Sequence, residues 1–160
     1  MKIGVVSDTH SRSIPQQLFN DFNGVDFIVH AGDFCTEQDL KVFTSLKDVK
    51  AVYGNMDENR LRVKLPEKLK FKWGNFSIGL LHGEGPAHKV LNFVQEKFKN
   101  DKLDVIIFGH SHQPLNEMIG NTLYFNPGSP NDTIFAPFCS YGILEVKDGQ
   151  IIGKIIKVKA

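Results

Sequence analysis

Cysteine is scarce in this sequence. Only Cys35 and Cys139 occur among its 160 residues, and they form no CxxC pair. This scarcity excludes a disulfide-stapled scaffold and a cysteine-rich structural zinc site. The N-terminal apolar stretch is interrupted by Ser7 and Asp8 and is too short for a secretory signal. We therefore expect two free thiols and a cytoplasmic location.

Long hydrophobic runs and an excess of one charge are also absent. No apolar segment approaches the roughly 18 residues that a membrane-spanning helix needs. The formal net charge is +1, so the chain lacks the strong positive field of a general binder of nucleic acids or anionic membranes. We expect no membrane or nucleic-acid partner, and any phosphate-bearing ligand must be recognised locally.

The residues that are present are those of an ordinary globular protein. Hydrophobic residues make up 41% of the chain and charged residues 23%. A chain of 160 residues is long enough for one domain with its own core. No linker, repeat or low-complexity segment interrupts it, so we expect a single domain over residues 1–160.

Five short apolar runs suggest buried strands, and each ends in a polar cluster. The runs are residues 3–6, 27–29, 51–53, 80–81 and 105–108. Continuous apolar runs of this length are typical of strands covered on both faces. Helical patterns at 15–22, 36–46 and 90–98 lie between them, which indicates βαβ units and a largely parallel sheet.

Two hairpins are expected outside this alternation. Gly74-Asn75 and Asp148-Gly149 are turn dipeptides between segments of strand character. A run of basic residues alternates with apolar ones around the first hairpin, and this alternation is typical of the solvated face of a strand. The run consists of Arg60, Arg62, Lys64, Lys68, Lys70 and Lys72.

All five polar clusters contain side chains that bind metals. In order, they are Asp8 and His10; Asp33; Asn55; His82; and His110 and His112. Ligands of parallel α/β sheets collect beyond the carboxyl ends of the strands, so these side chains should converge. If the backbone stays extended, residues two apart, as in the Asp8 and His110 pairs, point to the same side. Gly109 would let the chain turn tightly before His110.

Seven donors are too many for one tetrahedral ion. Two divalent ions about 3.5–4 Å apart, sharing one carboxylate, would use all of them. Mixed imidazole and oxygen donors without cysteine suit manganese, iron, zinc, nickel or cobalt, and we expect manganese first.

The ordered motifs DTH, GD, GN, HG and GHSH, followed by NPGS at residues 126–129, resemble the calcineurin-like metallophosphoesterase superfamily, in particular its small single-domain phosphodiesterases. The resemblance implies a four-layer α/β/β/α sandwich with two metals. It assigns Asp8, His10 and His112 to one ion and Asn55, His82 and His110 to the other. Asp33 would bridge the two.

The implied function is metal-dependent hydrolysis of a phosphate ester, most of all of a small phosphodiester. A hydroxide bridging the two metals would attack phosphorus in line. Asp33, Asn55 and His82 are the expected catalytic residues. Arg12 and Asn55 are the expected substrate-binding residues, because a guanidinium binds phosphate oxygens in a bidentate manner.

One position departs from the family pattern. Many relatives carry histidine immediately after the metal-binding Asn, whereas this chain has Met56. Methionine transfers no proton, so Asp57 or a metal-bound water would have to replace that histidine. This departure favours diesters with good leaving groups over a broad range of monoesters.

Several alternatives stay open. A retromer subunit of the same fold serves in protein trafficking, so this chain could be a non-catalytic metal-binding scaffold or protein-interaction module. Against a repair nuclease, the chain is nearly neutral and carries no added DNA-binding segment. His30, inside a predicted strand, reads as a core or supporting histidine and His88 as an exposed one. The natural substrate and any homo-oligomeric assembly are not readable from the sequence.

Overall fold

The computed structural model describes residues 1–160 and contains two five-stranded sheets. The first sheet has the strand order β10-β9-β1-β2-β3, in which β1, β2 and β3 are parallel and β9 and β10 are antiparallel additions. Its strands are β1 (Lys2–Val6), β2 (Phe27–His30), β3 (Val49–Ala51), β9 (Ser140–Lys147) and β10 (Gln150–Lys157).

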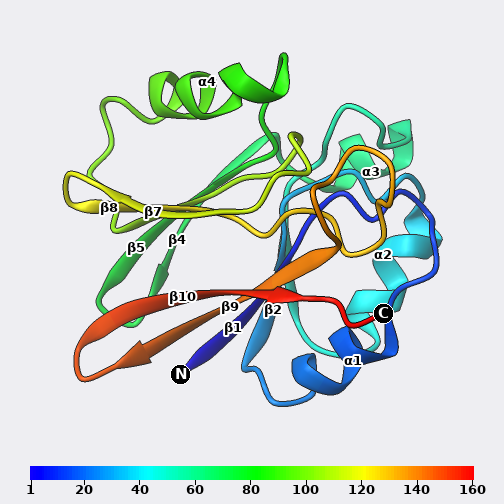
Figure 1. Ribbon diagram of the computed structural model, residues 1–160. Coiled ribbons are helices and arrows are strands. Elements are labelled where there is room, and N and C mark those ends of the chain that lie inside the picture. The colour runs from blue at the N-terminus through cyan, green and yellow to red at the C-terminus, as the bar shows by residue number, and fades with distance from the viewer.

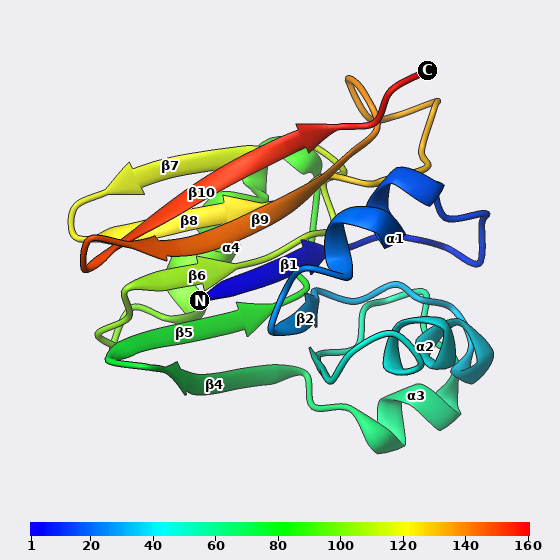
Figure 2. The same ribbon diagram turned by 90° about the horizontal axis from the view of Figure 1, so that it is seen from below.

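The second sheet has the order β4-β5-β6-β8-β7, with β5, β6 and β8 parallel. Its strands are β4 (Lys68–Trp73), β5 (Phe76–Leu81), β6 (Val105–Ile107), β7 (Leu115–Ile119) and β8 (Thr122–Asn126). In Figure 2, β1 of the first sheet and β5 of the second point toward the same end of the molecule, where loops gather. The carboxyl ends of both sheets therefore face one region.

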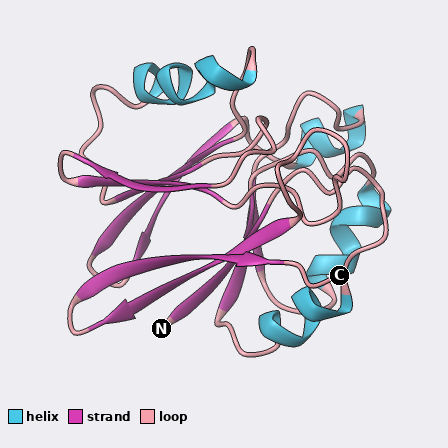
Figure 3. Cartoon of the chain, in the orientation of Figure 1, coloured by secondary structure: helices cyan, strands magenta, loops and turns pink.

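Helices cover the outer face of each sheet (Figures 1 and 3). Three helices pack on the first sheet: α1 (Gln16–Phe22), α2 (Glu37–Thr44) and α3 (Asn59–Lys64). The second sheet is covered by α4 (Val90–Lys97), which follows the short 3₁₀ helix η1 (Ala87–Lys89). The result is the four-layer α/β/β/α sandwich that the resemblance implied.

Alternation along the strands divides the core into layers. On β1, Ile3 and Val5 face the second sheet, whereas Val6 belongs to the layer beneath the helices. Gly4 lies on that outer side, and the ring of Phe22 packs so closely that a Cβ at position 4 would lie 2.8 Å from it. The largest buried cluster fills the space between the two sheets and so fixes their carboxyl ends relative to each other.

Three predicted helices and both predicted hairpins are present. The helix after Thr36 begins with a capping box, because the Thr36 side chain accepts the Asp39 N–H while the Asp39 carboxylate accepts the Thr36 N–H. The hairpins are the β4–β5 and β9–β10 pairs.

Other sequence-based predictions were wrong. Arg60, Arg62 and Lys64 were assigned to a strand face, but they lie on α3; only Lys68, Lys70 and Lys72 are on a strand. A helix of six residues is too short to show a clear 3.6-residue period. The strand alternation indicated a largely parallel sheet, and the parallel strands are divided between two mixed sheets, as the four-layer sandwich requires. The β7–β8 hairpin was not predicted.

In cysteine pairing and in helix length, the structure does not depart from what the sequence indicated. Cys35 and Cys139 are both unpaired. None of the helices combines the length and the apolar character that a membrane crossing requires.

The core between the sheets yields a stability prediction. Phe125 on β8 is fully buried, and its ring fits against Gly142 and Gly153, where an added Cβ would come within 2.4 and 2.9 Å of it. Phe125→Ala should lower the free energy of unfolding by about 3–5 kcal/mol in urea titrations, because it leaves a cavity. Phe135→Ala, at a side chain that is 77% exposed, is the matched control and should change it by less than about 0.5 kcal/mol. Equal effects of the two substitutions would contradict this assignment of the core.

Candidate metal centre

The loops that follow five strands meet at one place between the two sheets. The first sheet contributes Asp8 and His10 after β1, Asp33 after β2, and Asn55 after β3. The second sheet contributes His82 after β5, and His110 and His112 after β6. All seven side chains singled out in the sequence are therefore brought together, as the contacts below show.

The backbone at these residues is left-handed rather than extended. Five of the seven have positive φ: Asp8 (58°), His10 (48°), Asp33 (62°), His110 (69°) and His112 (58°). The assumption of an extended backbone at the two pairs was therefore wrong, although the side chains do converge. Non-glycine residues rarely adopt this conformation, and each costs of order 1–3 kcal/mol unless its surroundings impose it.

Hydrogen bonds between the loops impose this conformation. The Asp8 N–H donates to Gly32 O and the His10 N–H to Asp33 O, both at 3.0 Å. From the second sheet, the His110 N–H donates to Asp8 Oδ2 at 2.9 Å. The loops of the two sheets thus hold one another in place.

Gly109 has a different role from the one expected. Its φ is not positive, so it is not needed for a tight turn. A Cβ at this position would instead lie 2.0 Å from Ser7 Oγ and 2.7 Å from Asp8 Oδ2. The absence of a side chain lets the β6 loop approach Asp8 closely.

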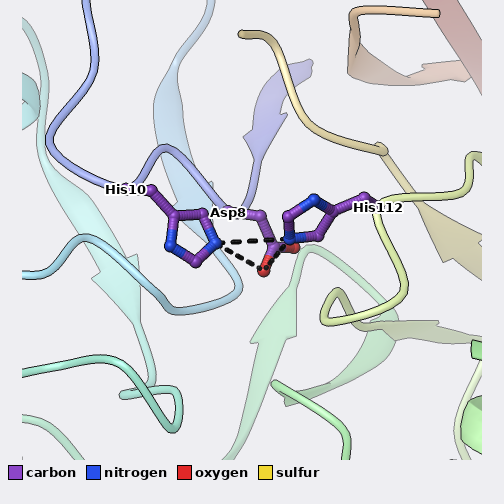
Figure 4. A group of neighbouring side chains, drawn as sticks. All are labelled: Asp8, His10 and His112. Atoms are coloured by element: carbon purple, nitrogen blue, oxygen red, sulfur yellow. Dashed lines mark hydrogen bonds and ion pairs between the residues drawn. The ribbon is translucent and has the colours of Figure 1, made fainter. Parts of the chain in front are cut away.

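Asp8, His10 and His112 form the first group of donors. Figure 4 shows these three side chains pointing toward one another. His10 Nε2 and His112 Nε2 are 3.2 Å apart. Asp8 Oδ1 lies 3.7 Å from His10 Nε2 and 3.4 Å from His112 Nε2.

Asp33, Asn55, His82 and His110 form the second group. His82 Nε2 lies 3.3 Å from Asp33 Oδ2 and 3.1 Å from Asn55 Oδ1. His110 Nδ1 lies 3.2 Å from both Asn55 Oδ1 and His82 Nε2. Asp33 Oδ2 is also 3.5 Å from His10 Nε2, so this oxygen faces both groups.

Three of the four histidines are oriented from behind by an oxygen atom. His82 Nδ1 contacts Ala31 O at 2.7 Å, and His110 Nε2 contacts Gly85 O at 3.0 Å. His112 Nδ1 lies 2.5 Å from Asp132 Oδ2. A ring N–H that donates to such an acceptor leaves the other ring nitrogen with a lone pair directed into the centre, as metal-binding histidines require.

The donor set fits divalent cations. Ligands at about 2.0–2.2 Å from one ion lie roughly 3.0–3.8 Å from one another, depending on the angle between them, which agrees with the spacings given for each group. Asp8 Oδ1 is buried and has no hydrogen-bond partner. A buried carboxylate oxygen without a donor is costly, and a cation would satisfy it. The residues present can therefore hold metal.

Electrostatic coupling is strong in the metal-free protein. Burial alone would lower the pKa of His82, but Asp8 and Asp33 more than offset this and raise it to about 9. The pKa of His112 is likewise lowered by burial and raised by Asp8 and Asp132, again to about 9. Burial raises the pKa of Asp8, yet the surrounding histidines hold it well below its usual range. The carboxylates therefore stay ionised and attract cations.

Asp57 supports the centre from the loop after β3, which also contributes Asn55. It is 4% exposed, and its two oxygens accept the N–H groups of Asp33 (3.0 Å), Gly54 (2.7 Å) and Cys35 (2.8 Å). These bonds join the β2 and β3 loops. The suggestion that Asp57 replaces the missing proton donor was therefore wrong, because both oxygens are occupied by the backbone.

The β3 loop has a second support. Arg62 on α3 donates from Nε to Asp57 O at 3.0 Å and from Nη2 to Asn55 O at 2.8 Å. Met56, between these residues, is 57% exposed, and its N–H donates to Asp33 Oδ1. Neither contact of Arg62 was predicted, because the sequence analysis assigned this residue to a strand.

Asp132 is the charged residue of the site that the sequence analysis missed. It is 1% exposed and lies in the loop between β8 and β9. Arg12, the expected substrate ligand, has Nη1 3.9 Å from Asp132 Oδ1, and its side chain is 48% exposed. No sequence signal pairs Asp132 with His112, since 20 residues separate them.

The two remaining histidines lie outside the donor groups. His30 is fully buried, stacks on Phe34 with ring centroids 3.5 Å apart, and contacts Thr9 Oγ1 through Nε2. Burial lowers its pKa to about 3, so it is neutral. Its interpretation as a core histidine is confirmed, and His88 is exposed as expected.

A cleft of about 230 Å³ adjoins the second donor group, and Asn55 and His82 form part of its wall. The aromatic side chains of Tyr53 and Phe93 also line it, together with Arg62. The guanidinium of Arg62 lies 5.3 Å from the centre of the Tyr53 ring. A molecule bound at the donor groups therefore has room to extend in this direction.

Comparison with known proteins identifies relatives of the whole chain. A sequence profile of the calcineurin-like phosphoesterase superfamily domain matches residues 1–149. A probable metallophosphoesterase of Methanocaldococcus jannaschii is 35% identical, with 99% of this chain and 82% of the relative covered. A phosphodiesterase of the same organism is 30% identical, with coverages of 80% and 83%.

Solved structures agree with these relatives. Vps29 from Entamoeba histolytica, in a complex with Zn²⁺, superposes with a TM-score of 0.74. The match covers 98% of this chain and 99% of Vps29, at 25% identity. The resemblance recognised in the ordered motifs is thereby confirmed.

The raised pKa values of His82 and His112 predict how stability depends on pH. Both groups have a pKa near 6.5 in an unfolded chain and about 9 in the folded, metal-free protein. A group with the higher pKa when folded contributes its full stabilisation below the unfolded value and loses it as the pH rises through the folded value. Urea titrations in the presence of a chelator should therefore show that the free energy of unfolding decreases as the pH rises from about 6.5 to about 9.

His112→Asn should flatten this slope. His88→Asn, which changes an exposed histidine, is the matched control and should leave it unchanged. Stability that is constant or rises across the same pH range would refute the coupling.

Proposed function

Because the chain belongs to the calcineurin-like phosphoesterase superfamily, we propose that it is a metal-dependent phosphodiesterase that hydrolyses a small phosphodiester. The observation that carries the proposal is the meeting of the two donor groups at Asp33 Oδ2, which faces His82 at 3.3 Å and His10 at 3.5 Å. One oxygen shared between two donor groups is suited to bridging two cations.

In this proposal the donors divide as the family pattern implies. One ion would be held by Asp8, His10 and His112 and the other by Asn55, His82 and His110, and Asp33 would be shared between them. Bound divalent ions supply a water of lowered pKa and neutralise the charge that develops on the phosphoryl oxygens. Manganese is the first candidate, since imidazole and oxygen donors without thiolate also suit iron, cobalt, nickel and zinc.

The protein supplies orientation rather than a proton at the β3 loop. Met56 has no transferable proton, and Asp57 is fully engaged by backbone N–H groups. The leaving group must then depart without protonation from this loop, which favours alcohols of low pKa. Arg12, near His112 through Asp132, remains a candidate for binding a phosphate oxygen.

The cleft beside Asn55 and His82 supports a diester substrate. A phosphodiester carries a second ester group that must lie somewhere near the donor groups. A cleft of about 230 Å³ with two aromatic side chains gives that group a place to bind. A monoester would leave this space unused.

A non-catalytic scaffold is the second candidate. The similarity to Vps29, whose full name is Vacuolar Protein Sorting 29, favours it, and that protein was solved with Zn²⁺ bound. Retention of metal ligands by itself therefore does not separate an enzyme from a scaffold of this fold. Hydrolysis is the property that does.

The enzyme proposal predicts metal-dependent turnover. Bis(p-nitrophenyl) phosphate should be hydrolysed faster than p-nitrophenyl phosphate in Mn²⁺, and EDTA should abolish both reactions. Asp33→Asn and His82→Ala should each reduce turnover by at least about 100-fold, since losing even an outer-shell partner of a metal costs about 10–100-fold. The rate of p-nitrophenolate release, recorded for each protein in a series of divalent metals, measures the turnover.

The matched control is His88→Ala, at an exposed histidine away from the donor groups, which should retain full activity. Absence of turnover in every metal, from folded protein that binds metal, would overturn the enzyme proposal and favour the scaffold.

The cleft makes a separate prediction about substrate size. Phe93→Ala should raise KM for bis(p-nitrophenyl) phosphate several-fold, because the ring lines the space proposed for the second ester group. KM for p-nitrophenyl phosphate should change little. Phe135→Ala, at an exposed ring that does not line the cleft, is the control. Equal changes with both substrates would remove the cleft from the binding site.

The domain extent, cellular location and partners of the chain are inferred from the sequence alone. We retain one domain over residues 1–160, a cytoplasmic location and the absence of a nucleic-acid partner as proposals. Homo-oligomeric assembly stays open.

A further inference from the structure

We propose that Asp132 is a positioning residue that holds His112 in the tautomer and orientation needed to bind metal. The inference rests on the proposed metal centre and adds a residue that the ordered motifs do not contain. Its basis is the contact between Asp132 Oδ2 and His112 Nδ1, at 2.5 Å. Because Nδ1–H donates to the carboxylate, Nε2 is the nitrogen that loses its proton when a metal binds, and this atom faces Asp8 Oδ1 at 3.4 Å.

The carboxylate of Asp132 is itself rigidly held. Its Oδ1 accepts the N–H groups of Ile134 (2.8 Å) and Phe135 (3.1 Å), and its Oδ2 accepts that of Ala136 (3.2 Å). The side chain is 1% exposed. A buried carboxylate fixed by three backbone donors cannot rotate away from His112, so it fixes the imidazole in turn.

Asp132 differs from the groups behind the other histidines. His82 and His110 are oriented by the neutral carbonyl groups of Ala31 and Gly85. His10 Nδ1 has only Cys35 Sγ nearby, at 4.0 Å. His112 is therefore the one candidate ligand backed by a carboxylate, and a carboxylate raises the basicity of the imidazole that it orients.

The first donor group depends on this contact more than the second does. In the first group, His10 Nδ1 has no strong hydrogen-bond partner. Only His112, through Asp132, and Asp8, through the His110 N–H, are fixed by strong hydrogen bonds. Arg12 Nη1 also lies 3.9 Å from Asp132 Oδ1. The same carboxylate thus lies next to a candidate metal ligand and a candidate phosphate ligand.

Asp132→Asn tests the proposal with a change of nearly equal size. The amide oxygen can still accept the N–H groups of Ile134 and Phe135. The amide nitrogen takes the place of Oδ2, so it no longer accepts the Ala136 N–H and instead donates to His112 Nδ1. That interaction stabilises the tautomer with the proton on Nε2, which cannot bind metal. Calorimetric titration of metal-free protein with Zn²⁺ should show two tight equivalents in the wild type. In the variant, one of them should weaken by about 10–100-fold.

Two controls separate positioning from a general structural effect. Asp101→Asn makes the same chemical change at a carboxylate paired with Lys70 elsewhere, and should keep both equivalents. In the background of His112→Ala, adding Asp132→Asn should cause no further loss of affinity, because the proposed effect passes through His112 alone. A further loss there would overturn the proposal.

Nitrogen-15 NMR of the zinc-loaded proteins gives a readout that stability does not affect. In the wild type, the His112 ring, assigned by its loss in His112→Ala, should show a protonated Nδ1 and a metal-bound Nε2. Asp132→Asn should lose that signature. Unchanged affinity and an unchanged ring signature would overturn the role of Asp132, whereas a wild type that binds no Zn²⁺ would instead contradict the proposed metal centre.

Discussion

Two buried carboxylates, those of Asp8 and Asp33, face imidazole nitrogens with no lysine or arginine close by. Asp8 Oδ1 lies 3.7 Å and Asp33 Oδ2 lies 3.3 Å from His82 Nε2, and Asp8 Oδ1 has no hydrogen-bond partner. Leaving such charge uncompensated in the interior costs several kcal/mol per ion. The surrounding loops must therefore hold the histidines close to the carboxylates, and the left-handed residues at the centre persist because cross-loop hydrogen bonds over-determine them.

The two-sheet architecture makes this convergence possible. Each sheet delivers its parallel strands to the same end, and the apolar layer between the sheets fixes their separation. The loops then cross-link: the Gly109 N–H donates to His82 O within the second sheet, and the His110 N–H reaches Asp8 of the first. A site built on the ends of packed strands is held more precisely than one built on a free loop.

Several residues support the centre without belonging to it. Asp57 and Arg62 hold the loop of Asn55 and Met56, and Asp132 lies behind His112. The occupation of Asp57 by backbone N–H groups has a chemical consequence, since together with Met56 it leaves that loop without a proton donor. The proposed hydrolysis would therefore rely on the charge of bound metal and on a leaving group of low pKa more than on general acid catalysis.

The sequence by itself selected the seven side chains that converge between the two sheets. The order of the motifs and the apolar runs before them were enough to select all seven donors, because a strand end is marked locally by the change from apolar to polar residues. It also marked the capping box at Thr36 and the two turn dipeptides, which are local as well. Only the tertiary structure decided which strands belong to each of the two sheets, that Gly109 permits a close approach rather than a turn, and that Asp132 pairs with His112. These features depend on contacts between residues far apart in the chain, such as Asp8 with His110 and His112 with Asp132, and no local pattern of residue types records such contacts.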